Sequence, residues 1–379
     1  MDPWILFDDG HPGLAPLCDL RASFELRTGA LTTLERITQQ IGCPPAALFV
    51  PEPLRELVAS RHPQPINELP PGDRFVCVHG RSTSLHDAAI AEPISRGRAQ
   101  ELLGAGRLEG EERAELLTRP WHVLTHCERN LPDDLSRFGG RLERLRPDAS
   151  RCIVIVGDEP VLIGRGVTVH PHVVFDTSAG PVVLDERATV RSMSVVVGPG
   201  YIGQDSIVVN HAHVRAGTVI GPHCKVGGEV NGCIFQGYSN KAHSGYLGNS
   251  FVGEWVNLGA DTVTSNLKNT YGQVRMQTDP DGEPESTGMQ FLGSIIGDHV
   301  KTAIGTRLLT GTCIHTGAML ATSGFPSKCV RRFAFLTDEG EKRYDLDRFL
   351  QVAEAVMRRR EMNVSDSLRR RLANLYACP

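Results

Sequence analysis

Residues 237–269 read G-Y-S-N-K-A-H-S-G-Y-L-G-N-S-F-V-G-E-W-V-N-L-G-A-D-T-V-T-S-N-L-K-N, and an apolar residue recurs about every six positions. In and just before this stretch the beat falls on Ile234, Tyr246, Val252 and Leu258, and Asn240 interrupts it. Two flanking runs keep the same period: Ile202, Val208, Val214, Ile220 and Val226 upstream, and Ile296, Thr302, Leu308, Ile314 and Leu320 downstream. A fixed short period indicates stacked, nearly identical structural units.

The six-residue period predicts a short strand and a turn in each unit, with three units closing one triangular coil. One aliphatic side chain per unit then points into a narrow core. Glycine often follows that residue, as in Ile202-Gly203 and Ile220-Gly221, and it permits the tight backbone of a corner. The pattern resembles the left-handed parallel β-helix of hexapeptide acyltransferases, and we place it at residues 150–335. Residues 267–290 break the beat and predict a loop that projects from the solenoid.

The two flanks of the solenoid differ from it in pattern. In residues 1–145, apolar runs at 4–7, 46–50 and 75–78 alternate with a helix that starts at the capping box Thr32-x-x-Glu35. This order predicts an α/β, Rossmann-like domain. In residues 344–379 an apolar stripe predicts C-terminal helices, the last of them capped by Ser365.

Composition narrows the class of protein. The net charge of −4 gives the protein no overall positive potential that would attract nucleic acid. The sequence contains no uninterrupted apolar run of about 18 residues, so we expect no membrane span. The N-terminal residues do not have the pattern of a signal peptide, and ten scattered cysteines without a C-x-x-C pair are typical of reduced thiols. We therefore expect a cytoplasmic protein. All six lysines lie at Lys225 or beyond.

The segment N-K-A-H-S-G-Y-L-G, followed by V-N-L-G-A and S-N, resembles the acetyltransferase half of the bifunctional N-acetylglucosamine-1-phosphate uridylyltransferase/glucosamine-1-phosphate acetyltransferase family. The opening I-L-F-D-D, with L-A-P-L and L-R-T-G-A-L-T after it, resembles a divergent bacterial branch of the same family. The resemblance implies acetyl-CoA, UTP and a sugar phosphate as substrates, Mg²⁺ as cofactor and a homotrimer as the assembly.

The chemistry of acetyl transfer assigns roles to the residues of the motif. A histidine is a suitable general base for an attacking amine, which points to His243. Amides can contact substrate or an oxyanion, and cations can bind the sugar phosphate. The resemblance adds an acid that contacts the sugar and two positions along the coenzyme A channel. The substrate residues expected are Arg215, Glu229, Lys241, Tyr246, Asn257 and Asn266, and the coenzyme residues expected are Ala260 and Thr306.

Two positions depart from the family pattern. The family has a phosphate-binding lysine twelve residues before the histidine, where this chain has Asn231. It also has a tyrosine after the second asparagine, where this chain has Leu267.

The N-terminal domain lacks the glycine-rich, lysine-containing triphosphate loop of ordinary sugar nucleotidyltransferases. Arg21 and Arg27 are the expected substitutes for the missing lysine. Asp8, Asp9 and Asp134 are the expected Mg²⁺ ligands, since Mg²⁺ binds one or two carboxylates together with phosphates.

Two other functions remain open from the sequence. A solenoid of this kind also occurs in zinc hydratases of the γ-carbonic-anhydrase type. The pairs His170-x-His172 and His211-x-His213, with His223, offer imidazole ligands if each pair lies on one strand. The chain could instead be a non-catalytic regulatory protein that binds a sugar nucleotide.

Overall fold

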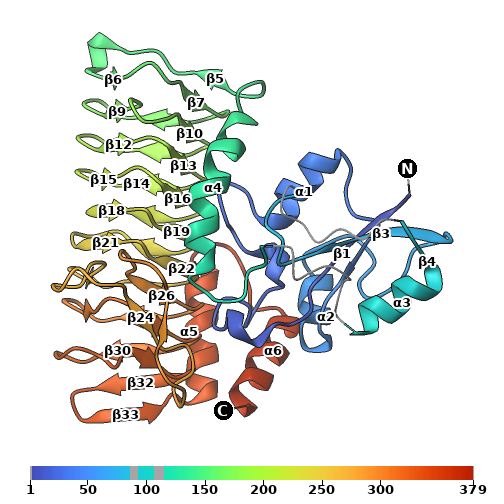
Figure 1. The fold of residues 1–379 in the computed structure, drawn as a ribbon. Helices are drawn as coiled ribbons and strands as arrows, with labels where there is room; N and C mark the ends of the chain where they lie inside the picture. The colour runs from blue at the N-terminus through green and yellow to red at the C-terminus, as the bar shows by residue number, and fades with distance from the viewer. Residues whose placement is uncertain (1, 86–92, 106–114, 379) are drawn as a thin grey trace.

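The computed structural model describes residues 2–85, 93–105 and 115–378 of the 379-residue chain. A small α/β domain lies beside a tall solenoid of stacked coils, and two C-terminal helices pack near one end of the solenoid (Figure 1). The predicted fold class is confirmed: an α/β N-terminal domain, a left-handed parallel β-helix and C-terminal helices.

The sheet of the N-terminal domain has the strand order β2-β1-β3-β4. The first three strands are parallel and β4 is antiparallel. Helix α1 begins at the predicted capping box, where Thr32 Oγ1 accepts from the Glu35 N–H and the Glu35 carboxylate accepts from the Thr32 N–H. The elements are β1 (Trp4–Phe7), α1 (Thr33–Ile41), β2 (Ala47–Phe49), α2 (Glu52–Ala59), β3 (Arg74–His79), β4 (Ile94–Ser95) and α3 (Arg96–Ala105).

The solenoid has three faces of hydrogen-bonded strands, one strand per coil on each face. The longest face begins with the antiparallel β5 (Glu143–Arg144) and continues in parallel through β7 (Val161–Ile163), β10 (Val182–Leu184), β13 (Gly200–Ile202), β16 (Thr218–Ile220), β19 (Ile234–Gly237), β22 (Phe251–Glu254), β26 (Ser294–Ile296), β29 (Thr312–Ile314) and β31 (Cys329–Val330). The second face holds β8 (Thr168–Val169), β11 (Thr189–Val190), β14 (Ile207–Val208), β17 (Lys225–Val226) and β20 (Asn240–Lys241), and later coils add β27 (Lys301–Thr302), β30 (Met319–Ala321), β32 (Ala334–Thr337) and β33 (Gly340–Arg343). The third face holds β6 (Val154–Val156), β9 (Val174–Asp176), β12 (Val195–Val197), β15 (His213–Val214), β18 (Glu229–Asn231) and β21 (Tyr246–Gly248), and the separate pair β23 (Val263–Thr264) and β28 (Arg307–Leu308) lies in later coils.

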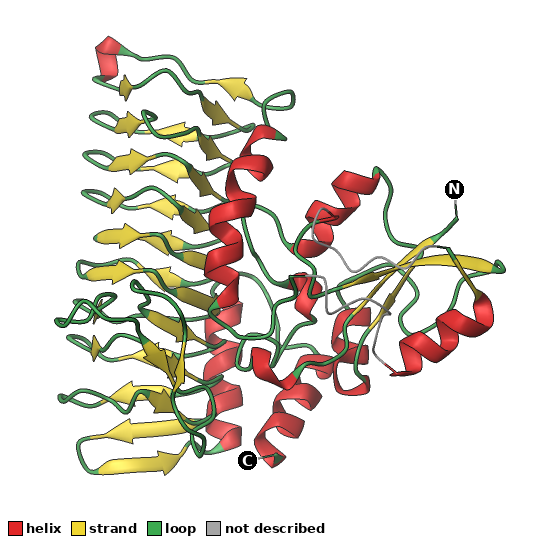
Figure 2. Cartoon of the chain, viewed as in Figure 1, coloured by secondary structure: helices red, strands yellow, loops and turns green. Residues whose placement is uncertain are grey.

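Helix α4 (His122–Ser136) runs along the longest face and joins the two domains (Figure 2). Its buried side chains Leu124, Leu131 and Leu135 share one apolar cluster with outward-pointing residues of that face, among them Val183 and Val219. The N-terminal domain therefore packs against the solenoid along an apolar interface rather than hanging from a linker.

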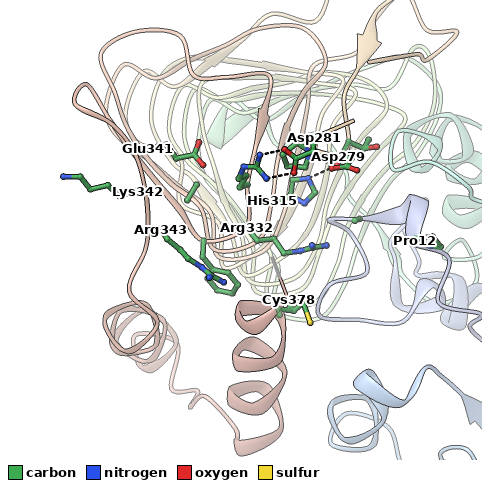
Figure 3. Close-up of a pocket in the computed structure, with 16 residues that line it drawn as sticks. Pro12, Asp279, Asp281, His315, Arg332, Glu341, Lys342, Arg343 and Cys378 are labelled. Carbon is green, nitrogen blue, oxygen red and sulfur yellow. Dashed lines mark hydrogen bonds and ion pairs between the residues drawn. The ribbon is translucent and has the colours of Figure 1, made fainter. Parts of the chain in front are cut away.

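The insert at 267–290 is not a projecting loop. It contains an antiparallel hairpin of β24 (Arg275–Met276) and β25 (Glu285–Ser286), and Val274 and Met276 are buried in the cluster that α4 covers. Arg119 of the N-terminal half binds Glu285 at 2.7 Å, and Asp281 binds Arg331 of a late coil (Figure 3). Its apolar residues thus fold the insert back onto the molecule.

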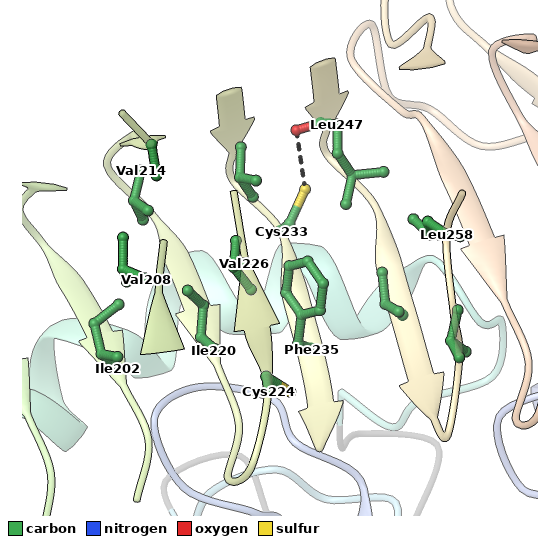
Figure 4. Close-up of a cluster of buried hydrophobic side chains, with 14 of the residues drawn as sticks. Ile202, Val208, Val214, Ile220, Cys224, Val226, Cys233, Phe235, Leu247 and Leu258 are labelled. Atoms are coloured by element: carbon green, nitrogen blue, oxygen red, sulfur yellow. Dashed lines mark hydrogen bonds between the residues drawn. The ribbon is translucent and has the colours of Figure 1, made fainter. Parts of the chain in front are cut away.

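The inward-facing residues follow the predicted beat except in one region (Figure 4). After Val226 the next inward residue is Val230 and not a residue six positions on, because the corner Gly227-Gly228 is short. Phe235, Lys241 and Leu247 are consequently the inward residues of the next coil. The prediction that Ile234 and Tyr246 point inward was therefore wrong by one residue, whereas Val252 and Leu258 point inward as predicted.

The C-terminal helices cover a ladder of aromatic corners. Rings from successive coils stack at centroid distances of 4.7 Å for His223 and Tyr238 and 4.6 Å for Tyr238 and Trp255, and His299 continues the row. Phe349 packs edge-on against His299. The helices are α5 (Leu346–Arg358) and α6 (Asp366–Ala377), and Ser365 caps α6 as predicted. None of the helices among the described residues is long and apolar enough to cross a membrane.

Candidate active site at a solenoid corner

His243 lies on the corner between β20 and β21, and its side chain is exposed. The backbone of this corner is held from inside the solenoid by Lys241. The Lys241 ammonium donates to the carbonyls of Gly227 at 2.9 Å, His243 at 2.7 Å and Ser244 at 3.3 Å. The Ser244 hydroxyl also donates to Asp261 at 2.5 Å. The imidazole is thus open to a substrate while the backbone that carries it is fixed.

The role expected for Lys241 was a contact with the sugar phosphate, and the structure gives it a different place. The side chain is only 2% exposed and points inward, because the short corner before it moves Lys241 into the core register. Burial lowers the pKa of its ammonium to about 8. A group bound to three backbone carbonyls supports the His243 corner and has no free face for phosphate.

Tyr246 lies among three asparagines on the third face of the solenoid. The Asn231 amide is 3.5 Å from the Tyr246 hydroxyl, and the Asn266 amide donates to the Asn249 side chain at 2.7 Å. Both Tyr246 and Asn266 crowd the space above Gly248, where a Cβ would collide with the tyrosine hydroxyl. The structure therefore brings Tyr246 and Asn266 together and adds Asn249, which the sequence did not single out.

Arg215 and Glu229 lie on the same face, on the coils before Tyr246. They form an exposed ion pair at 3.1 Å, and Glu229 is the direct strand neighbour of Tyr246. An exposed pair of this kind contributes little to stability, so both side chains are free to exchange partners with a ligand.

Ala260 and Thr306, the residues expected along the coenzyme channel, lie at corners of the coils after His243, and the Asp261 N–H beside Ala260 donates to the Ser244 carbonyl at 3.2 Å. Asn257, which was expected to contact the sugar, lies on a different face from Tyr246. Asn257 is exposed on the second face, between Asn240 and Lys301. The Ala260 carbonyl accepts from the Gly305 N–H at 2.7 Å, so Ala260 and Thr306 belong to adjacent corners. Thr306 is only 1% exposed, and its hydroxyl donates to the Ala303 carbonyl. Its side chain is therefore part of the corner's structure.

In the N-terminal domain, a cavity of about 550 Å³ lies at the carboxyl ends of β1 and β2. Ligands in open α/β sheets bind at this edge. Asp8 and Asp9 border it, together with Asn67, Arg96 and Gln100, to which the sequence gave no role. Arg96 donates to the carbonyls of the preceding loop at 2.9 Å and 3.0 Å.

The carboxylates of this region do not fit a Mg²⁺ site. Asp8 accepts from the N–H groups of Gly10 and Ser23, and burial raises its pKa. Burial opposes ionisation of Asp9 as well, but hydrogen bonds from His79 and Arg81 outweigh it and hold its pKa well below the usual range. Asp134 receives two bonds of 2.7 Å from the Arg36 guanidinium, inside the domain. Among the described residues, no group of three or more His, Cys, Asp or Glu side chains is arranged to hold a metal.

Arg21 and Arg27 lie at the domain interface and not in the nucleotide cavity. Arg21 is 1% exposed and binds Asp298 at 2.8 Å and Glu254 at 3.2 Å, both on the solenoid. The Arg27 N–H donates to Gln236 at 3.0 Å. These arginines connect the two domains, and the pattern of the sequence could not distinguish this role from phosphate binding.

The histidine pairs do not have the geometry that a zinc site on one strand requires. His172 and His211 adopt left-handed backbone conformations, with φ of 62° and 60°. Each H-x-H pair therefore crosses a corner, and its two side chains do not share a strand face. His223 stacks on Tyr238 and lies 3.7 Å from Asp205.

Another contact near the site comes from far along the sequence. Arg360, just after α5, donates to the Asn240 side chain at 3.0 Å. In the sequence, this segment is marked by a cluster of arginines at 358–360. Here the arginine ties a C-terminal helix to the coil that carries His243.

Comparison with known proteins supports the family resemblance. No family model matches the chain. The chain is 31% identical over 155 residues to the bifunctional sugar-1-phosphate nucleotidylyltransferase/acetyltransferase of Sulfurisphaera tokodaii, covering 40% of this chain and 37% of the relative. It is 28% identical over 164 residues to the bifunctional protein GlmU of Methanococcus aeolicus, covering 43% and 39%. It is 38% identical over 107 residues to the bifunctional protein GlmU of Sphingopyxis alaskensis, covering 27% and 23%.

Among solved structures, the polysialic acid O-acetyltransferase OatWY matches at 13% identity, over 50% of this chain and 86% of that chain. Its TM-score of 0.18 is too low to carry an argument. The curated matches span less than half of each relative, so they establish kinship and not a shared activity. The resemblance predicted from the sequence is confirmed: the chain's curated relatives are bifunctional sugar-1-phosphate nucleotidyltransferase/acetyltransferases.

Proposed function

We propose that the solenoid transfers an acetyl group from acetyl-CoA to the amine of an amino-sugar 1-phosphate, with His243 as general base. The observation that carries the proposal is the His243 corner itself. It presents an exposed imidazole on a backbone fixed by Lys241, between the polar cluster of Tyr246 and Asn266 and the coil of Asn257 and Ala260.

The proposed step balances in atoms and charge. The sugar nitrogen attacks the thioester carbonyl carbon, and His243 takes the proton that the nitrogen loses. The carbon–sulfur bond then breaks, and the coenzyme leaves as a thiol after the imidazolium returns that proton to sulfur. General-base catalysis of this kind contributes about 10²–10⁴-fold to a rate.

The face beside the His243 corner and the corners of the following coils suit the two substrates. We assign the sugar to the face of Tyr246, Asn231 and Asn266, where amide and hydroxyl groups can bind sugar hydroxyls. Arg215 is the exposed cation of that face, and Glu229 can accept from the sugar once the pair opens. We assign the coenzyme to the adjacent corners that hold Ala260 and Thr306.

We further propose a homotrimer in which neighbouring solenoids complete the site. Exposed apolar side chains lie in and near the coils after His243, with Ile304 80% exposed and Tyr271 70% exposed. A contact between subunits would cover them. Light scattering at micromolar concentration tests the assembly, and a monomer would contradict it.

For the N-terminal domain we propose a nucleotide site in the cavity at the ends of β1 and β2. The reaction proposed there transfers a uridylyl group from UTP to the acetylated sugar 1-phosphate, forming UDP-N-acetylglucosamine and pyrophosphate. The internal pairing of Asp9 with Arg81 favours the alternative, a domain that binds a sugar nucleotide without turning it over.

One experiment separates these functions. The protein is incubated with acetyl-CoA and a panel of amino-sugar phosphates, and release of the coenzyme thiol is followed. A parallel panel of nucleoside triphosphates and sugar phosphates is assayed for pyrophosphate. Thiol release without pyrophosphate would assign acetyl transfer to the solenoid and a binding role to the N-terminal domain. Absence of thiol release with every amino-sugar phosphate would overturn the acetyltransferase proposal.

A further inference from the structure

Two cysteines face each other on the last coils of the solenoid, away from the His243 corner. Cys313 of β29 and Cys329 of β31 are direct partners in neighbouring parallel strands. Their inward neighbours Ile314 and Val330 belong to the solenoid core, so both thiols point outward toward the apolar cluster at the domain interface. Directly paired strand residues have the Cα separation that a disulfide accepts.

His315 completes the cluster. Its Nε2 lies 3.9 Å from the Cys313 sulfur and 3.8 Å from the Cys329 sulfur, and 2.8 Å from the Thr278 carbonyl of the insert. Its Nδ1 is buried and has no hydrogen-bond partner among the described residues. The same ring borders a cavity of about 540 Å³ between the insert, the last coils and α6, which gives small molecules an approach to the cluster (Figure 3).

The two thiols differ in acidity. The Cys313 thiol donates to the Cys329 sulfur, and this bond, with help from His315, lowers the pKa of Cys329 to about 6. The same interaction and burial raise the pKa of Cys313 well above its usual value. A thiolate beside a protonated thiol is the arrangement in which one sulfur attacks and the other resolves the product.

We propose that Cys313 and Cys329 form a redox-active dithiol that reacts with small hydroperoxides. The Cys329 thiolate attacks the peroxide oxygen, the O–O bond breaks, and Cys329 becomes a sulfenic acid as hydroxide leaves. The Cys313 sulfur then attacks the sulfenic sulfur, its proton leaves with the hydroxyl as water, and an intercoil disulfide forms. Two electrons pass from the two sulfurs to the peroxide; with hydrogen peroxide, the released hydroxide takes a proton from solvent, so that two waters are formed.

The disulfide would fix the end of the solenoid to its surroundings. The residues that follow Cys329 bind other parts of the chain: Arg331 binds Asp281 of the insert, and Arg332 binds Asp19 of the N-terminal domain at 2.7 Å. Oxidation would therefore join β31 covalently to β29 at the point where solenoid, insert and N-terminal domain meet.

The test uses the reduced full-length protein and hydrogen peroxide at equimolar concentration. Peptide-resolved alkylation over time is expected to show Cys313 and Cys329 lost first of the ten cysteines and recovered as one linked peptide. The loss should be on the order of tenfold faster than that of the exposed Cys43 and Cys152, since reaction follows the thiolate. Loss of either exposed cysteine first, or a link from Cys329 to Cys378, would overturn the proposal without any variant.

Variants sharpen the assignment. In Cys313→Ser, the sulfenic acid of Cys329 should persist and be captured by a cyclic 1,3-diketone. In Cys329→Ser the fast reaction should disappear, and in His315→Asn it should slow several-fold. Cys378→Ser is the matched control, because Cys378 borders the same cavity and should leave the rate unchanged. A Cys329→Ser protein that melts like wild type and still reacts at the wild-type rate would refute the role of Cys329.

Discussion

The His243 corner and the cavity of the N-terminal domain are the two candidate sites, and they differ in whether their titratable side chains are exposed or bound within the protein. At the corner, the buried ammonium of Lys241 donates hydrogen bonds to backbone carbonyls, and the His243 side chain is exposed. In the cavity, the acidic residues are engaged internally: Asp9 binds Arg81, and Asp8 binds backbone N–H groups. An exposed histidine can accept a proton from a bound substrate, which suits the corner to proton transfer. The carboxylates of the cavity are already bound by groups of the protein, which suits the cavity to binding rather than to catalysis.

The sharpest way to break this comparison is to remove the proposed base. His243→Ala should lower kcat for acetyl transfer by about 10²–10⁴-fold, because a general base contributes that much. Nucleotide binding and the melting temperature should not change. The matched control is His213→Ala, which removes another exposed histidine from a solenoid coil. Equal acetyltransferase rates in wild type and His243→Ala would show that the corner is not catalytic.

Replacing Arg21 tests whether this arginine binds the nucleotide, as the sequence predicted, or joins the two domains, as the structure indicates. Arg21→Met leaves Asp298 buried without its partner, and loss of one member of a buried pair costs about 3–5 kcal/mol of unfolding free energy. Urea unfolding measures this loss. Nucleotide affinity of the folded variant should equal that of wild type. Arg55→Met, which breaks an exposed pair with Glu52, serves as the control and should shift stability by less than about 1 kcal/mol. A large loss of nucleotide affinity with normal stability would restore Arg21 to the nucleotide site.

Lys241→Met should separate positioning from stability at the corner. It removes the bonds to the carbonyls of His243 and Ser244, and misplacement of a catalytic group by about 1 Å can cost on the order of 10²-fold in rate. We expect kcat to fall by about 10–100-fold with KM nearly unchanged. The melting temperature should change little, since the cost of burying an ammonium is also removed. Lys225→Met changes an exposed lysine one coil earlier on the same face, where it pairs with Asn240 rather than with Lys241, and should have no effect.

The pH profile of the wild type checks the same point. The pKa of Lys241 is lowered from 10.5 to about 8, so above pH 8 the folded protein loses a proton that the unfolded chain keeps. This group therefore adds stability as pH rises from 8 to 10.5. Acetyl transfer should nevertheless decline over that range, because a neutral amine has two N–H groups for three carbonyls. A decline of the same shape in Lys241→Met would show that another group causes it.

Filling the N-terminal cavity should affect only nucleotide binding. Gln100 of α3 borders the cavity, and Gln100→Trp should weaken binding of a nucleoside triphosphate by about tenfold, as an occluded site does. Acetyl transfer should remain at the wild-type rate. Glu101→Trp changes the exposed residue beside it and controls for the bulk of the indole. Calorimetric titration measures both, and identical affinities in the two variants would move the nucleotide site elsewhere.

The smallest expected effect concerns the residue that departs from the family pattern. Asn231 approaches the Tyr246 hydroxyl on the face assigned to the sugar. Asn231→Lys should lower KM for a phosphorylated amino sugar by a few-fold, since an added cation near a phosphate is worth about 1 kcal/mol in a partly exposed setting. KM for the unphosphorylated amino sugar should stay the same. An equal change for both sugars would place the phosphate away from Asn231.

The sequence predicted the fold class because a six-residue period leaves few alternatives for stacking. It also singled out the His243 motif as a candidate site, because the residues of that motif follow one another along the chain, and this assignment stays a prediction. It did not locate what depends on contacts between distant segments. Arg21 and Asp134 looked like ligand residues, yet each binds a partner that lies far away in the sequence. Lys241 was misplaced because a corner with fewer residues moves the inward position, and a strict count of six does not detect that.

The short corner at Gly227-Gly228 has a wider consequence. Its left-handed glycine, with φ of 68°, lets the chain turn in fewer residues, and a Cβ there would approach the Lys241 ammonium and the His243 carbonyl at 3.0 Å. The corner thus changes the register of the repeat: the inward position moves to Val230 and then to Phe235, Lys241 and Leu247, and a later interval of five residues sets a further register at Val252 and Leu258. In so regular a repeat, an insertion or deletion at a corner can move a polar residue into the core or a core residue out to solvent. Neither change requires a substitution elsewhere in the sequence.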